Sequence, residues 1–84
     1  MYEVRFDEKA LQNLEKLEKK TSKRIVEKIV SASQDPFHYF DRLKGRTEFK
    51  LRVGEYRVIA DIDESAKEIF VLVIDNRKNV YKKL

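Results

Sequence analysis

The stretch that decides the fold is Phe49–Ile62, which reads FKLRVGEYRVIADI. Apolar and polar side chains alternate through Phe49–Val53 and again from Tyr56 onward, and a period of two is typical of half-buried β-strands. Gly54 and Glu55 interrupt the alternation and favour a tight turn. We therefore predict an antiparallel hairpin with one apolar face and one charged face.

Two further strands are predicted on either side of this hairpin in the chain. Glu68–Asp75 is almost entirely apolar, so we expect a central strand that is covered on much of both faces. Tyr2–Phe6 alternates apolar and charged side chains and predicts a first strand. Asp63–Ala66 is a turn that joins the hairpin to the apolar strand.

The residues between the first strand and the hairpin predict a pair of helices. Asp7 is a good N-cap for a helix that runs to about Lys20, with its apolar side chains on one face. Thr21 or Ser22 caps a second helix, which must end before Pro36. Because the joint between them is short, the two helices form an antiparallel hairpin.

The length and composition of the chain indicate a single small globular domain. Its 84 residues, 42% of them apolar, make a single domain over residues 1–84. Residues 37–45 are a connector, so the chain reads β-α-α-β-β-β. This is an α+β fold in which an N-terminal helical hairpin packs on one face of a small, mostly antiparallel sheet.

The absence of cysteine and the single histidine exclude a disulfide framework, a thiolate nucleophile and a multi-histidine metal cluster. No apolar run approaches the ~20 residues of a membrane span, and the N-terminus does not read as a signal peptide. We expect a soluble, cytoplasmic protein with no membrane partner.

Charge is concentrated in separate segments of the chain. Residues 42–57 carry six cations against two acids, residues 58–76 carry one cation against five acids, and residues 77–84 carry four cations and no acid. If the fold brings the two basic segments together, they form a surface for a polyanion.

Other sequence patterns that could indicate a phosphate, catalytic or metal site are only weakly represented. Gly45 and Gly54 stand alone rather than in a phosphate-binding loop. His38 follows Pro36 in the connector and is typical of an ordinary loop histidine. The carboxylates around the turn after Ile62 lack the spacing of a calcium loop and are typical of a solvated turn.

The remaining candidate site is a cluster of cations. Lys50 and Arg52 point to the same face of one predicted strand, and Arg57 lies alongside them on the next strand. Arg77 follows the neighbouring strand, with Tyr81 four residues beyond it. These side chains form either the wet face of a sheet or an anion site. The anion site is favoured because like charges on neighbouring strands repel, and a bound anion relieves that repulsion.

Several stretches together resemble the RelE/ParE toxin superfamily, most closely its RelE branch. They are Leu43-Lys44-Gly45, the block FKLRVGEYRVI over residues 49–59, the apolar run over residues 71–74, and NRKNVY over residues 76–81. The first strand and the helix pair fit as well, so the resemblance spans nearly the whole chain. It implies the toxin of a type II toxin–antitoxin system, with a RelB-like antitoxin as its partner.

The resemblance also implies an activity that needs no cofactor. RelE-like toxins enter the ribosomal A site and inhibit translation by cutting the messenger RNA there without a metal. The 2′-hydroxyl attacks the adjacent phosphate and leaves a 2′,3′-cyclic phosphate. Such an intramolecular attack needs alignment, charge neutralisation and proton transfer. The positions that match the functional residues of the family are Lys50, Arg57, Arg77 and Tyr81, with Arg52 in the same motif.

Each of these positions has an expected role. Arg57 clamps the scissile phosphate, because a guanidinium matches phosphate oxygens in bidentate fashion. Lys50, crowded by Arg52 and Arg57, is expected to have a lowered pKa and to act as base. Arg77 stabilises or protonates the leaving 5′-oxygen, and Tyr81 stacks on a base or orients the 2′-hydroxyl. The other basic side chains expected to bind RNA are Arg42, Lys44, Arg46, Arg52, Lys82 and Lys83.

Two positions depart from the RelE pattern. Glu48 stands where RelE proteins often have a second lysine, and Asn76 stands where many relatives have histidine. Asp41 matches an acidic position that another branch uses, so Asp41 and Glu48 are alternative acid–base groups.

Two other functions remain open. The chain is alternatively a ParE-like protein that inhibits DNA gyrase by binding, or a degenerate toxin that binds only antitoxin and RNA. Retention of all four motif positions favours the nuclease. We expect oligomers only through the antitoxin complex.

Overall fold

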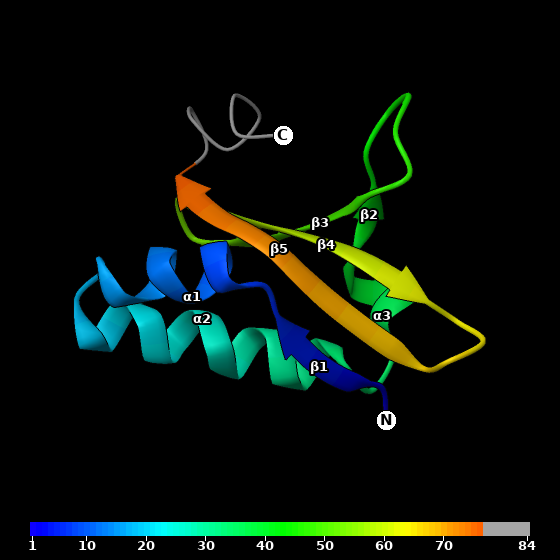
Figure 1. Ribbon diagram of the computed structural model, residues 1–84, viewed down its shortest axis with the longest axis horizontal. Coiled ribbons are helices and arrows are strands. Elements are labelled where there is room, and N and C mark those ends of the chain that lie inside the picture. The colour runs from blue at the N-terminus through cyan, green and yellow to red at the C-terminus, as the bar shows by residue number, and fades with distance from the viewer. Residues whose placement is uncertain (77–84) are drawn as a thin grey trace.

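The computed structural model describes residues 1–76 of the chain, which form one five-stranded sheet with helices on one face (Figure 1). The elements are β1 (Glu3–Phe6), α1 (Glu8–Glu15), α2 (Lys19–Ala32), α3 (Pro36–Tyr39), β2 (Asp41–Arg42), β3 (Phe49–Val53), β4 (Tyr56–Asp63) and β5 (Glu68–Asn76). The α+β class and the helical hairpin on one face are confirmed. The predicted connector is wrong in part, because it contains the short elements α3 and β2.

The strands lie in the order β1-β5-β4-β3-β2, and only β1 and β5 run parallel. Two parallel strands must be joined by a long crossover connection. The connection from β1 to β5 begins with α1 and α2 (Figure 1). The expected hairpin of β3 and β4 is confirmed, with Leu51 opposite Val58. The prediction that the apolar strand β5 is central is also confirmed, because β1 and β4 flank it.

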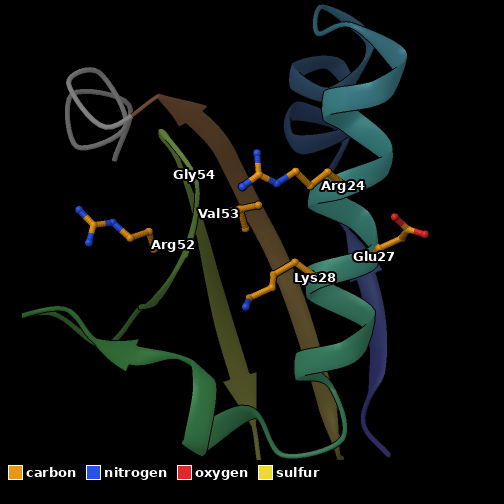
Figure 2. Close-up of a pocket in the computed structure, with 6 residues that line it drawn as sticks. All are labelled: Arg24, Glu27, Lys28, Arg52, Val53 and Gly54. Atoms are coloured by element: carbon orange, nitrogen blue, oxygen red, sulfur yellow. The ribbon is translucent and has the colours of Figure 1, made fainter.

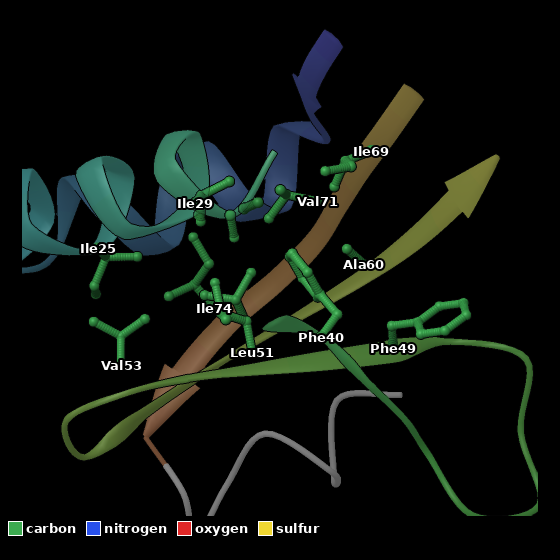
Figure 3. Packing of buried hydrophobic residues seen from close by; sticks show 13 residues of the cluster. Ile25, Ile29, Phe40, Phe49, Leu51, Val53, Ala60, Ile69, Val71 and Ile74 are labelled. Atoms are coloured by element: carbon green, nitrogen blue, oxygen red, sulfur yellow. The ribbon is translucent and has the colours of Figure 1, made fainter. Parts of the chain in front are cut away.

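The main core lies between the helices and the sheet (Figure 3). Ile25 and Ile29 on α2 are fully buried against side chains that come from every second residue of the strands, such as Leu51 and Val58. The other face of the sheet carries a second, smaller apolar cluster of Leu43, Ile59 and Val73. We call this uncovered face the open face.

The helix boundaries differ from the prediction. Asp7 is the N-cap of α1, as expected, and its carboxylate accepts a hydrogen bond from the Lys9 amide over 3.2 Å. However, α1 ends at Glu15, and α2 begins at Lys19 with Glu18 as its N-cap. The prediction that Ser22 or its neighbour caps α2 is therefore wrong. The Ser22 hydroxyl instead donates to the Leu14 carbonyl over 2.6 Å and ties the two helices together.

A side-chain hydrogen bond from α1 to β5, close to a β-bulge, links α1 to the centre of the sheet. The register between β4 and β5 shifts after Ile59, so Leu72 is an extra residue on β5. Farther along β5, beyond the end of β1, the amide of Ile74 donates to Oδ1 of Asn13 over 2.9 Å. The Asn13 side chain thus supplies the acceptor that a neighbouring strand supplies elsewhere.

We expect Asn13→Ala to lower the free energy of unfolding by about 1–2 kcal/mol, because it leaves the Ile74 amide without an acceptor. For a domain of this size, that loss corresponds to a fall in melting temperature of roughly 5–15 °C. Thermal unfolding followed by circular dichroism measures it. Asn13→Asp keeps an oxygen acceptor and should stay near the parent, as should Gln12→Ala on the exposed side of α1. Equal melting temperatures for Asn13→Ala and the parent would contradict this role.

Candidate active site

Lys50, Arg52 and Arg57 share the open face, as the sequence predicts. Arg52 and Arg57 are direct partners in the register of β3 and β4. The neighbouring pair, Leu51 and Val58, is buried beneath the helices, and side chains alternate along a strand. The buried pair therefore fixes the cations on the opposite face.

Arg57 differs from the other cations because it is only 9% exposed, whereas Arg52 is exposed. On its other side, β5 places Asp75 directly opposite Arg57. The arginine thus lies between one position of like charge and one of opposite charge. A guanidinium keeps its charge in proteins, and one held by packing has little side-chain freedom to lose when an anion binds. Burial and a permanent charge are features that suit a side chain to anion binding.

The two candidate acid–base groups lie in different surroundings. The register of β2 and β3 places Asp41 directly opposite Lys50 on the open face. Glu48 is paired instead with Arg46, whose Nε lies 3.0 Å from Oε1 of the carboxylate. The hydrogen bond from Arg46 lowers the pKa of Glu48, which makes this carboxylate a weaker base. Of the two acids, only Asp41 lies directly opposite Lys50.

The loop between β2 and β3 folds against one end of the open face. Leu43 packs on Ile59 and Val73, and its amide donates to the Glu48 carbonyl over 2.9 Å. The segment from Arg42 to Thr47 lines a shallow hollow of about 550 Å³. These contacts carry the candidate RNA-binding residues Lys44 and Arg46 to this end of the sheet.

The structure does not bring every candidate to the open face. Arg42 is directed away from it, and its Cζ lies 5.0 Å from the centroid of the Phe49 ring. Arg77, Tyr81, Lys82 and Lys83 lie outside the described residues, so their roles stay predictions. Within residues 1–76, no three histidine or acidic side chains form a group that could hold a metal ion. In the same residues, no helix is both long and apolar enough to cross a membrane.

A second group of cations lies between α2 and the end of β3 at Val53 and Gly54, where sequence reasoning did not place any (Figure 2). Arg24 and Lys28 on α2 line a pocket of about 390 Å³ together with Arg52. The Arg24 guanidinium lies over Gly54, where an added Cβ would come within 3.3 Å of Nη1. The i,i+4 spacing of Arg24 and Lys28 predicts a shared helix face, but nothing in the sequence places that face beside β3.

The open face also carries Asp61, which lies two residues before the end of β4. Although this side chain reaches solvent, loss of part of its water shell raises the pKa of the Asp61 carboxyl. The neighbouring Glu48 carboxylate raises that pKa further. Asp61 therefore lies in a more acidic part of the open face than Arg57 does, with Glu48 as its neighbour.

Comparison with known sequences assigns the chain to a family. Residues 4–81 match the profile described as ParE toxin of type II toxin–antitoxin system, parDE. The chain belongs to the ParE toxin family. This confirms the resemblance to the RelE/ParE superfamily that was drawn from the residues on β3, β4 and β5.

The individual relatives carry RelE names. A putative toxin RelE4 of Methanocaldococcus jannaschii is 33% identical over 89 residues, covering 99% of this chain and 94% of that protein. The RelBE2 toxin–antitoxin complex of Mycobacterium tuberculosis contains a chain that is 29% identical, with a TM-score of 0.84 over 90% of this chain and 98% of that one. Isolated RelE of E. coli, 23% identical over 99% of this chain and 94% of its own, has the same fold with a TM-score of 0.77.

We expect Asp61→Asn to stabilise the protein at neutral pH. Because the folded state raises the pKa of this carboxyl, its ionised form lowers stability above the folded pKa. The cost disappears once the pH falls below the unfolded pKa of about 3.9. Urea unfolding at pH 7 should therefore show the variant to be more stable than the parent, and the difference should vanish near pH 3. Glu64→Gln, in the exposed turn after β4, is the control for removal of an acid. A stability gain that is independent of pH would contradict the explanation.

Proposed function

We propose that this toxin is a ribosome-dependent endoribonuclease that cuts messenger RNA in the A site. The observation that carries the proposal is the buried Arg57 at the centre of a cationic open face, beside Arg52 and near Lys50. A buried, fixed guanidinium stabilises charge that develops on a phosphate more effectively than a mobile surface cation does. The RelE names of the relatives support the same assignment.

The proposed reaction is an internal transesterification. The 2′-oxygen forms a bond to the adjacent phosphorus, the bond from phosphorus to the 5′-oxygen breaks, and a 2′,3′-cyclic phosphate remains. Arg57 neutralises the charge on the phosphoryl oxygens. We propose Lys50 and Asp41, which are partners across β2 and β3, as the alternative groups that accept the proton of the 2′-hydroxyl. Arg77 is assigned to the leaving 5′-oxygen, and Tyr81 to a neighbouring base or the 2′-hydroxyl.

The proposed partners are the ribosome with its messenger RNA and a RelB-like antitoxin. The relative from M. tuberculosis is part of a toxin–antitoxin complex, which supports a similar complex here. An acidic antitoxin segment would neutralise the cationic face and bury part of it. We propose that the chain forms oligomers only through this complex and that it acts in the cytoplasm, where ribosomes translate.

Gyrase inhibition is the second candidate, because the matching profile describes a ParE toxin. A protein that inhibits gyrase by binding needs no fixed phosphate ligand, whereas this chain holds Arg57 at only 9% exposure on the cationic face. The nuclease is therefore preferred, and the two functions differ in what the purified protein does to RNA and to supercoiling.

The first functional prediction is that cleavage requires the 2′-hydroxyl of the substrate. Programmed ribosomes with an unmodified A-site codon should be cut, and primer extension should map the cut to that codon. A 2′-O-methyl group at the nucleotide on the 5′ side of the cut should abolish cleavage while ribosome binding stays within a few-fold. Intact RNA together with inhibited DNA supercoiling would assign the chain to gyrase instead. Products that end in a simple 3′-hydroxyl would contradict the proposed chemistry.

The second functional prediction concerns Arg57. We expect Arg57→Lys and Arg57→Gln to lower the single-turnover cleavage rate at saturating ribosomes by at least ~100-fold, the size seen when one oxyanion donor is removed. Lys keeps the charge but lacks the bidentate fork. The ribosome concentration at half-saturation should change much less than the rate. Lys20→Ala, which removes an exposed cation from α2, is the matched control, and melting curves show which variants fold. A folded Arg57→Lys variant with the parent rate would remove Arg57 from the mechanism.

A further inference from the structure

A continuous strip of aromatic rings and cations lies at one end of the sheet. The Lys67 Nζ lies 5.2 Å from the centroid of the Tyr2 ring, and the Tyr2 and Phe37 ring centroids are 6.3 Å apart. The Phe37 and Phe49 centroids are 5.7 Å apart, and Arg42 lies over the outer end at Phe49. We call these five residues the aromatic strip. Three rings in edge-to-face contact thus have a cation at either end.

Phe37 is the exposed centre of the aromatic strip. Pro36, which begins α3, is buried and anchors this short helix, while the Phe37 side chain after it is 46% exposed. Large aromatic side chains on a small protein are usually covered. A ring that is held by two other rings and still faces solvent offers a rigid stacking surface.

Lys67 adopts a backbone conformation that is unfavourable for lysine. Its φ is +58°, in the left-handed region that only glycine, asparagine and aspartate adopt readily. Its carbonyl accepts a hydrogen bond from the Glu3 amide over 2.8 Å, which fixes the turn beside β1. The sequence thus keeps a cation at a position where a residue without a positive charge would fit the backbone better.

We propose that Phe37, the exposed ring of the aromatic strip, stacks an unpaired base of a structured RNA, with phosphates of the same RNA at Arg42 and Lys67. Aromatic rings combined with cations are the usual platform for unpaired nucleotides. Phe49 of the strip and Lys50 of the open face are neighbours on β3 and point to opposite sides of the sheet. The RNA held by the strip is therefore distinct from the scissile phosphate. This inference rests on the proposed function and assigns the strip to the large RNA that presents the substrate.

The charge of the strip favours RNA over a protein ligand. Both of its ends are cationic, and the chain continues from Arg42 into the hollow that Lys44 and Arg46 line. An RNA strand carries a phosphate at every nucleotide, so it can present a phosphate to the cation at each end of the strip. An acidic segment of the antitoxin is the competing occupant, and the experiment below includes it.

The test uses Phe37→Leu, which retains an apolar side chain against Tyr2 and Phe49 but removes the aromatic face. We expect the ribosome concentration at half-maximal cleavage to rise roughly 5- to 100-fold, the range given by the loss of one base-stacking contact. The cleavage rate at saturation should stay within about two-fold of the parent. Leu11→Ala on α1 is the matched control, because Leu11 is also 46% exposed. It should leave both quantities unchanged.

The variant Lys67→Asn tests the cationic end, since asparagine tolerates the left-handed backbone. Binding of the full chain to a fluorescein-labelled RNA hairpin with an unpaired loop, measured against salt, should lose roughly 0.7–0.9 from the log–log slope. The variant's melting temperature should stay at or above that of the parent.

Unchanged half-saturation for Phe37→Leu, with the parent cutting normally, would overturn the strip as an RNA contact while leaving the nuclease intact. The same result with weakened antitoxin binding would assign the strip to the protein partner and also overturn the proposal. If the parent does not cut RNA on ribosomes, the proposed function fails first. In that case binding to the labelled RNA hairpin alone tests whether the strip contacts RNA. Unaltered affinity of both variants for that RNA hairpin would overturn the proposal.

Discussion

The register between β3 and β4 holds Arg52 directly opposite Arg57, and the candidate site depends on this pairing of like charges. The register cannot slip by one residue without exposing Leu51 and Val58 and burying the arginines. Packing of the core between the helices and the sheet therefore keeps the two arginines close together on the open face, although they repel each other. Asp75 on the next strand offsets part of the repulsion, and a bound phosphate offsets more. Packing on one face thus fixes the arrangement of charges on the other.

The same alternation divides the molecule into two working surfaces. One side of β3 gives Lys50 and Arg52 to the open face, while the other side gives Phe49 to the aromatic strip. A rigid sheet between them keeps the proposed chemistry and the proposed docking contact at a fixed separation. An enzyme that must find one phosphate within a very large RNA gains from such a fixed separation, because docking then orients the catalytic groups.

The sequence predicts the parts of the fold that have a clear period. The alternation from Phe49 and the apolar run of β5 are long enough to fix their strands, their order and the face that carries Lys50, Arg52 and Arg57. Elements as short as α3 and β2 contain too few residues to show a period. The joint between α1 and α2 was misplaced because the helical pattern continues through it, while the turn is set by packing.

The sequence predicts which residues share the candidate site, but it does not predict how buried they are or which side chains they contact. Alternation assigns Arg57 to a face, but its burial depends on neighbours from β3 and β5. The Arg46–Glu48 pair depends on the loop conformation, and the position of Arg24 depends on how α2 crosses β3. The partners in these contacts, and the way they meet, follow from tertiary packing, so propensity at a single position carries no signal for them.

The parallel pairing of β1 with β5 has a consequence for the order of events during synthesis. Glu3 pairs with Glu68, so the earliest strand to leave the ribosome waits for a partner that is made after all the other described strands. Isolated short helices and two-stranded hairpins are at best marginally stable, and the sheet closes only when β5 enters between β1 and β4. Pairings so far apart in sequence slow folding. Until β5 is made, a chain of this kind remains incomplete and its open face unassembled.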